Sequence, residues 1–210
     1  MKVYFIRHGE GLDDVYNEYG SWSDRELSPH GVRTAFRTAE KLKKLEKKYD
    51  LILSSPLKRA SQTAKIVGSV LGLQVTEAPY LKERNTYGLL SGVNKDLGIE
   101  EYPEMNAAFL EGRYIPASER YSDFVERIKI LMDKLRPLPH ENLICSTHGH
   151  VVTAIIEEFF GLTRNSVNNG SVLGIQLDAK GQKIIHADGI TFTKDEKVAR
   201  GVALRKFKTG

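Results

Sequence analysis

Short apolar segments alternate with longer amphipathic ones along most of the chain, and this order constrains the fold more than any other feature. The apolar segments have the length of buried strands, and they predict strands over residues 3–6, 51–53, 74–77 and 143–146. The amphipathic segments predict helices over about 28–49, 55–72, 95–112, 118–135 and 151–160. Strands that alternate with helices favour an α/β fold with a mostly parallel sheet.

Serine–proline pairs mark the starts of two predicted helices. Ser28-Pro29 and Ser55-Pro56 each place a good N-cap residue before a proline that suits the first helical turn. Residues 9–26 are polar and rich in turn-forming residues, which predicts a long loop, and such loops usually carry function. Residues 172–177 and 183–187 predict a hairpin across a turn at 178–181.

The composition is that of an ordinary globular protein. With 210 residues, 40% of them apolar and 28% charged, we expect one domain over 1–210. The lone cysteine, Cys145, excludes an internal disulfide and a Cys-rich zinc site, and it favours a reducing compartment. No apolar run approaches the roughly 18 residues of a membrane span, and residues 3–6 are too few for a signal-peptide core. We therefore expect a cytoplasmic protein with no membrane partner.

The net charge of +4 raises the question of a nucleic-acid partner. Two basic clusters exist: one in the first predicted helix at Lys41, Lys43, Lys44, Lys47 and Lys48, and one near the end at Lys194, Lys197, Arg200, Arg205, Lys206 and Lys208. Because no nucleic-acid motif accompanies them and the aromatic residues do not interleave with them, we interpret them as solvated surface and expect no nucleic-acid partner. A non-catalytic binder of a phospho-ligand or nucleic acid is the weaker alternative.

Three predicted strand ends carry the side chains best suited to catalysis. The first leads to Arg7-His8-Gly9-Glu10, the second through Ser54-Ser55-Pro56 to Arg59, and the fourth to Thr147-His148-Gly149-His150. Because the carboxyl ends of parallel strands share one edge of the sheet, where ligands bind, we expect two histidines and two arginines to converge there.

Such a set of side chains suits phosphoryl transfer. Arginine grips phosphate oxygens with a planar fork, and a neutral histidine can attack phosphorus to form a phosphohistidine. The leaving alcohol then needs a proton donor, for which a carboxylic acid with a raised pKa would serve. A zinc site on His148, His150 and His8 and a reactive Cys145 explain fewer residues, and we expect no metal.

Five segments, taken in order, resemble the histidine phosphatase superfamily, the phosphoglycerate-mutase-like proteins. They are Arg7-His8-Gly9-Glu10, the helix start LSPHG at 27–31, SSPLKRASQTA at 54–64, LKER at 81–84 with Gly88 and Gly92 after it, and Thr147-His148-Gly149. The family fold that this resemblance implies is a three-layer α/β/α sandwich with a mostly parallel central sheet. It also implies a cap-like insert at about 84–120.

The resemblance also implies a role for each matched residue. His8 would be the phosphorylated nucleophile, and Arg7 and Arg59 would bind the phosphoryl group. His148, with Gly149 beside it, would complete the phosphate pocket, and Glu83 would be the proton donor. A small phosphorylated metabolite is the implied partner, and a homodimer is an expectation by analogy with the family alone.

Departures from the pattern bear on which branch of the family the chain follows. Segments 19–24 and 83–95 are similar to mutase motifs, but Asp14 stands where mutases carry a phosphate-binding asparagine, a role that would then pass to Asn17. Arg84, Lys95 and Arg113 are candidate contacts for a second anionic group of the substrate. Because the insert is short, hydrolysis of a phosphomonoester is the leading expectation, with no cofactor. A phosphoglycerate mutase that uses 2,3-bisphosphoglycerate is the alternative.

Overall fold

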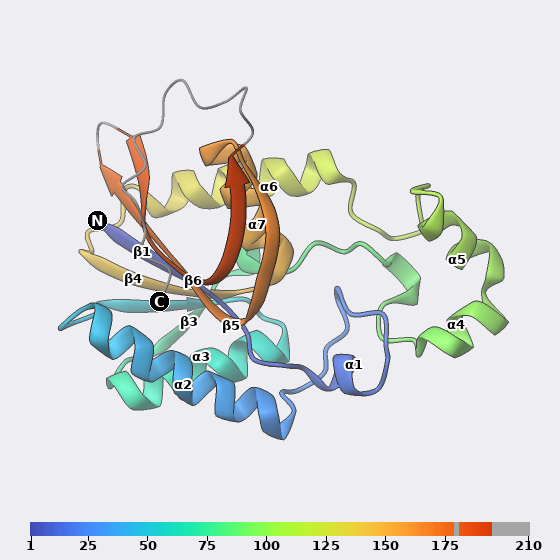
Figure 1. Ribbon diagram of the computed structural model, residues 1–210, viewed down its shortest axis with the longest axis horizontal. Coiled ribbons are helices and arrows are strands. Elements are labelled where there is room, and N and C mark those ends of the chain that lie inside the picture. Colours follow the sequence, from blue (N-terminus) through green and yellow to red (C-terminus); the bar gives the residue numbers. More distant parts are fainter. Residues whose placement is uncertain (179–180, 195–210) are drawn as a thin grey trace.

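A six-stranded sheet forms the centre of the computed structural model, which describes residues 1–178 and 181–194 (Figure 1). The strand order is β3-β2-β4-β1-β5-β6. The bounds are β1 Lys2–Arg7, β2 Leu51–Ser54, β3 Val75–Glu77, β4 Asn142–Thr147, β5 Leu162–Asp178 and β6 Gly181–Lys194. Strands β3, β2, β4 and β1 are parallel, whereas β5 runs antiparallel to both β1 and β6. The predicted, mostly parallel sheet is confirmed.

Helices cover both faces of the sheet, as predicted for a three-layer sandwich. Helices α2 (Pro29–Leu45) and α3 (Lys58–Leu71) lie on one face, and α6 (Tyr121–Leu135) and α7 (Gly149–Phe160) lie on the other (Figure 1). The two-residue period of β1 explains the two cores: Val3 and Phe5 pack with α6 and α7, and Tyr4 and Ile6 pack with α2 and α3. A buried apolar run such as β1 is therefore buried on both sides.

Helix α2 begins as predicted and ends earlier. Pro29 occupies the first turn, and the Ser28 hydroxyl accepts a hydrogen bond from the Gly31 N–H at 2.9 Å. The prediction placed the end near residue 49, but the helix ends at Leu45 because Glu46 is extended. The Glu46 carboxylate there accepts hydrogen bonds from Lys2 Nζ (2.6 Å) and Tyr4 Oη (2.5 Å), which link it to β1.

The single helix predicted over 95–112 is wrong. The chain forms two helices, α4 (Lys95–Glu101) and α5 (Pro103–Leu110). Pro103 has no N–H to continue α4 and disfavours a helical conformation at Tyr102, so a new helix starts at the proline. The hairpin is correct in place but longer than predicted, and residues 179–180 of its turn lie outside the described residues.

Two further differences concern the loops. The loop predicted over 9–26 contains one short helix, α1 (Leu12–Val15). Between β3 and α4, the chain contains two 3₁₀ turns, η1 (Pro79–Leu81) and η2 (Gly88–Leu90). Neither turn is long enough to leave a periodic pattern in the sequence.

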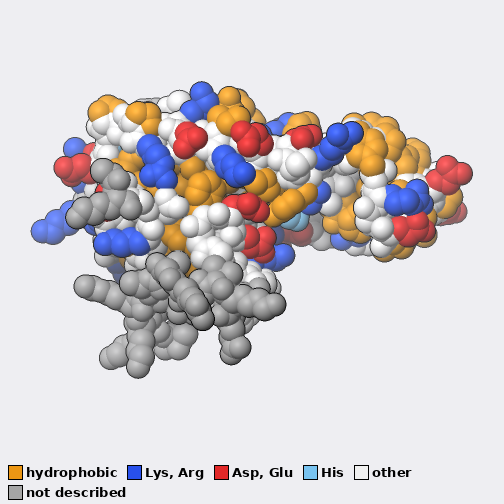
Figure 2. Space-filling model, turned by 90° about the horizontal axis from the view of Figure 1, so that it is seen from above, with side chains coloured by type: hydrophobic (Ala, Val, Ile, Leu, Met, Phe, Trp, Pro, Cys, Tyr) orange, Lys and Arg blue, Asp and Glu red, His pale blue; other side chains and the backbone are white. Residues whose placement is uncertain are grey.

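Helices α4 and α5 lie at one end of the molecule, away from the sheet (Figure 1). Figure 2 shows hydrophobic side chains gathered at this end, which carries the exposed residues Leu97, Ile99, Tyr102, Leu110 and Tyr114. In the described part of the chain, no helix combines the length and hydropathy needed to cross a bilayer.

Candidate active site

The register of the sheet brings the predicted residues together. Arg7 at the end of β1 pairs with Thr147 at the end of β4, and Ser54 of β2 pairs with Ser146. The ladder continues one residue further, because the His8 N–H donates to the Thr147 carbonyl at 3.0 Å. The residues after the three strands therefore meet at one sheet edge, as the parallel arrangement predicts.

The His8 ring is buried and has a defined tautomer. Its side chain is at the centre of the site, and the residue is 4% exposed. Nδ1 lies 2.6 Å from the Gly9 carbonyl oxygen, which only accepts hydrogen bonds, so Nδ1 carries the proton. Nε2 accepts a hydrogen bond from Arg59 Nε at 3.0 Å and therefore holds the lone pair. Burial, followed by the charges of Arg59 and Arg7, holds the pKa of His8 well below its ordinary value, so the ring is neutral.

His148 faces His8 across the site. The two ring centroids are 4.9 Å apart with an interplanar angle of 61°. Nε2 of His148 lies 2.7 Å from the Ser55 hydroxyl, which fixes the ring. Burial, and then the charge of Arg59, also holds the pKa of His148 well below its ordinary value. Among the described residues, Nδ1 of His148 is buried without a hydrogen-bond partner, so this nitrogen is available to a ligand.

The two arginines flank the histidines and reach the site from different elements. Arg59, 2% exposed in the first turn of α3, also donates through Nη1 to the Ser23 carbonyl (2.6 Å) and through Nη2 to the Ser21 carbonyl (2.7 Å). Arg7 donates through Nη1 to the Val167 carbonyl at 2.5 Å, and within the described residues its Nε is buried without a partner. Two cations thus sit where a phosphate dianion would need compensating charge.

Hydrogen bonds to the backbone hold the segment that carries Glu83 in place. The Glu83 backbone carbonyl accepts hydrogen bonds from Trp22 Nε1 at 2.7 Å and from Arg127 Nη2 at 3.3 Å. Arg127 also donates to the backbone carbonyls of Tyr80 and Lys82 and forms an ion pair with Glu119 at 2.9 Å. These contacts hold the segment that carries the acid against α6.

The pKa of Glu83 differs from the expectation. Burial raises it, but the hydrogen bond and charge of His150, the charge of Arg59 and the N–H of Arg84 outweigh burial, so the pKa lies below its ordinary value. The raised pKa expected of the proton donor is therefore wrong for the protein without substrate. The cause is the surrounding positive charge, which a bound phosphate dianion would offset.

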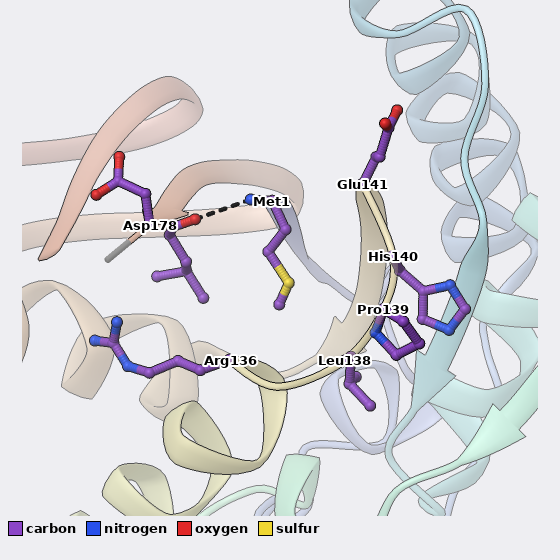
Figure 3. A pocket seen from close by; sticks show the side chains of 8 residues that line it. Met1, Arg136, Leu138, Pro139, His140, Glu141 and Asp178 are labelled. Carbon is purple, nitrogen blue, oxygen red and sulfur yellow. Dashed lines mark hydrogen bonds between the residues drawn. The ribbon is translucent and has the colours of Figure 1, made fainter. Parts of the chain in front are cut away.

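A cavity of about 190 Å³ opens beside the acid. It is lined by Arg7, Glu83, Gly149, His150, Thr153, Arg164 and Val167. A larger hollow of about 690 Å³ lies at the opposite edge of the sheet, around Met1, Arg136 and His140 (Figure 3). None of the predicted site residues lines this hollow, whereas Arg7, Glu83 and Gly149 line the smaller cavity, so we place the chemistry beside the smaller one.

The other predicted contacts lie further out. Asn17 is exposed, and its backbone carbonyl accepts the N–H of Lys95 at 2.8 Å. Asp14 is exposed too, but its charge acts on the guanidinium of Arg7. Its neighbour Asp13 is buried, and burial raises the pKa of Asp13 although the charge of Arg59 lowers it. The acid that replaces the usual asparagine is therefore exposed, yet close enough to Arg7 for the two charges to interact.

The three residues predicted to hold a second anionic group lie in different surroundings. The Arg84 guanidinium lies 5.2 Å from the ring centroid of Tyr121, and among the described residues its Nε is buried without a hydrogen-bond partner. Arg113 is paired with Glu111 at 2.6 Å, and both side chains are 59% exposed. Lys95, partly buried, begins α4. The structure does not bring these three to the histidines.

Sequence reasoning missed four residues that support the site. Ser55 could have been found, because it follows a strand that ends at the same edge. Trp22 lies on a loop, Arg127 on α6 and Arg164 on a polar part of β5. Their contacts with Glu83 or with its cavity depend on tertiary packing. No local pattern signals such contacts.

The alternative sites have little support in the geometry. His148 contacts Ser55 while His150 contacts Glu83, so the two rings of the considered zinc site have different partners. Burial raises the pKa of the Cys145 thiol, which disfavours a reactive thiolate. In the basic run of α2, Lys41 is paired with Asp188 at 2.5 Å. The basic tail beyond Lys194 lies outside the described residues.

Comparison with known proteins agrees with this geometry. The family model described as "Histidine phosphatase superfamily (branch 1)" matches residues 3–187. The phosphoglycerate mutase of Schizosaccharomyces pombe is 30% identical over 175 residues, which are 79% of this chain and 82% of the mutase. The 2,3-bisphosphoglycerate-dependent phosphoglycerate mutase of Bartonella tribocorum is 29% identical over 206 residues, 94% of this chain and 95% of its own.

A solved structure extends the likeness to the fold. The alpha-ribazole phosphatase from Shigella flexneri matches with a TM-score of 0.77, at 22% identity, over 98% of this chain and 100% of its own. With the family match over most of its length, the chain belongs to branch 1 of the histidine phosphatase superfamily, whose members are phosphatases and phosphoglycerate mutases, and it is an enzyme of that kind.

Proposed function

We propose that the protein is a metal-independent phosphomonoesterase that transfers the phosphoryl group of a small phosphorylated metabolite to His8 and then to water. The observation that carries this proposal is the neutral His8 ring, with its lone pair at Nε2, held between Arg59 and Arg7 and facing His148 at 4.9 Å. A neutral, oriented imidazole among fixed cations suits attack on a phosphate dianion.

In the first step, Arg59 Nε releases Nε2 of His8 and donates to a phosphoryl oxygen instead. Nε2 then attacks phosphorus, and the bond from phosphorus to the leaving oxygen breaks. The proton stays on Nδ1, and its hydrogen bond to the Gly9 carbonyl stabilises the phosphorylated ring. Arg59 and Arg7 offset the charge on the phosphoryl oxygens, and the free Nδ1 of His148 contacts one of them. Fixed donors of this kind contribute about 3 kcal/mol each to transition-state stabilisation.

Glu83 supplies and then recovers a proton. Its carboxyl protonates the leaving oxygen in the first step, and the resulting carboxylate takes a proton from the water that attacks phosphorus in the second. The second step releases inorganic phosphate and returns His8 to its neutral form. The negative charge of bound substrate offsets the arginines, which favours the protonated carboxyl that the first step needs.

The surroundings of the cap support hydrolysis over mutase activity. A mutase must hold its intermediate and rebind it in a second orientation, which requires further cationic contacts in the site. Here Arg113 is paired with Glu111 at the surface, and Arg84 lies over Tyr121. We propose that residues 84–120 form a short cap that leaves the phosphorylated His8 open to water.

Hydrolysis of p-nitrophenyl phosphate in the presence of EDTA tests the proposal. We expect turnover that His8→Ala abolishes and that His140→Ala, at the opposite sheet edge, leaves unchanged. Turnover that survives the loss of His8, or that EDTA removes, contradicts the proposal.

A bisphosphoglycerate-dependent mutase is the second candidate, because the two relatives described above are named phosphoglycerate mutases. It predicts interconversion of 3- and 2-phosphoglycerate that depends on added 2,3-bisphosphoglycerate. A preparation that hydrolyses phosphomonoesters but lacks this interconversion excludes it.

A further inference from the structure

We propose that His150 is a positioning residue that carries protons between solvent and the buried carboxyl of Glu83. The proposal rests on the proposed function, in which Glu83 gives a proton to the leaving group. His150 has no other role in that mechanism, yet it lines the same cavity.

Both contacts of His150 with the acid fall on one carboxylate oxygen. The His150 backbone N–H donates to Oε2 of Glu83 at 3.3 Å, and the ring Nδ1 lies 3.5 Å from the same oxygen. The other oxygen, Oε1, accepts the N–H of Arg84 at 2.9 Å. One backbone N–H thus holds each carboxylate oxygen, and the imidazole lies beside Oε2, the oxygen with the longer backbone hydrogen bond. Such contacts commonly tighten when substrate binds.

The two side chains differ sharply in exposure. The Glu83 side chain is 9% exposed, whereas the His150 side chain is 47% exposed. The imidazole is therefore far more accessible to water than the carboxyl. Histidine is also the side chain best suited to exchange protons near neutral pH.

Positive charge surrounds this pair from several elements. The titratable and charged groups that face it are Arg7 on β1, Arg59 on α3, Tyr87 before η2, Arg127 on α6 and Arg164 on β5. The hydrogen bond and charge of His150 itself, and then the charge of Arg59, favour the ionised form of Glu83 before substrate binds. The acid consequently needs a proton before it can act, and His150 lies on a direct route from solvent.

Every proton is accounted for over one turnover. A proton moves from Nδ1 of protonated His150 to Oε2 of Glu83, which leaves a neutral imidazole and a neutral carboxyl. The carboxyl proton then passes to the leaving oxygen as its bond to phosphorus breaks. The attacking water later returns a proton to Glu83, which passes it back to the neutral imidazole of His150, so both groups regain their starting forms.

Two esters that differ in leaving group separate this role from a purely structural one. Phenyl phosphate leaves poorly without a proton, whereas p-nitrophenolate leaves readily as an anion. For His150→Ala, we expect kcat/KM to fall about tenfold for phenyl phosphate and less than about twofold for p-nitrophenyl phosphate. Glu83→Gln should give the same split with a larger loss, and His140→Ala should change neither rate.

Added imidazole provides a second readout, because the exposed position of the ring admits a small base. It should restore the phenyl phosphate activity of His150→Ala, and the loss should reappear in His150→Gln, which retains the backbone contact. Equal losses on both esters, no rescue, or full activity of His150→Gln overturns the proposal. If His150→Ala does not fold, His150→Gln decides the matter alone. A wild-type protein that hydrolyses neither ester contradicts the proposed function itself, and this proposal with it.

Discussion

Replacing Gly31 by alanine should destabilise the protein, although the same change inside a helix ordinarily stabilises it by about 1 kcal/mol. Gly31 lies in the first turn of α2. A Cβ there would lie 2.9 Å from the backbone nitrogen of Glu10, 3.0 Å from its carbonyl carbon, and closer still to its carbonyl oxygen. Because these are backbone atoms, no rotation of a side chain relieves the clash, and the two segments must separate by about 1 Å.

The cost follows from this separation. Overpacking of this kind costs about 1–3 kcal/mol, of which the gain in helix propensity offsets about 1 kcal/mol. For a chain of this size, a net loss of up to about 2 kcal/mol lowers the Tm by up to about 8 °C. The displaced segment carries His8 two residues before Glu10, so kcat/KM should also fall, by about tenfold or more.

Gly72→Ala is the matched control. Gly72 ends α3 with a φ of 70°, and no atom lies within 4 Å of the place that an alanine Cβ would take, so the substitution costs about 1 kcal/mol by backbone strain alone. Thermal unfolding and p-nitrophenyl phosphate turnover should show similar losses of Tm in both variants and a loss of kcat/KM in Gly31→Ala only. A Gly31→Ala variant that is more stable than wild type, or fully active, would refute the reasoning.

The remaining predictions concern the histidines and the support of Glu83. Burial, and then the charge of Arg59, lowers the folded-state pKa of His8 and His148. Their contribution to the free energy of unfolding is therefore complete above the unfolded pKa of about 6.5 and is lost as pH falls below it. The urea midpoint of unfolding should drop as pH falls through this window, and His148→Gln should make that drop smaller. Ser55→Ala removes the 2.7 Å contact to His148, and we expect a loss of about 1 kcal/mol and a roughly tenfold lower kcat/KM; an unchanged kcat/KM would mean that the ring needs no such anchor. Arg127→Met removes the side-chain donor to the Tyr80 and Lys82 carbonyls and one of the two side-chain donors to the Glu83 carbonyl, so it should slow phenyl phosphate hydrolysis more than p-nitrophenyl phosphate hydrolysis. Equal slowing would argue against its support of Glu83.

The layers of the fold were predictable because they depend on local periodicity. The four predicted strands and the helices with Ser-Pro starts leave patterns within a few residues, and the parallel order then places the strand ends together. The break at Pro103 is equally local, but the apolar pattern that continues across it favoured a single helix. The full length of β5 could not be predicted, because its first half is polar and is a strand only through its pairing with the end of β6.

The site likewise has residues that local sequence predicts and residues that depend on tertiary packing. His8 and His148 follow strands directly, so their convergence could be predicted from the sheet alone. The environment of Glu83 could not, because it depends on Trp22, Arg127 and His150, which come from three distant segments. The direction of its pKa shift is a sum over those neighbours, and no sequence motif reports that sum.

Trapping of the phosphorylated enzyme tests the mechanism most directly. The protein is mixed with p-nitrophenyl phosphate in EDTA, denatured within the first turnover under alkaline conditions that preserve phosphohistidine, and digested for mass spectrometry. We predict one phosphate on the peptide that contains His8, absent from His8→Ala and lost on acid treatment. Turnover without phosphate on His8, or with phosphate on another residue, would contradict the mechanism.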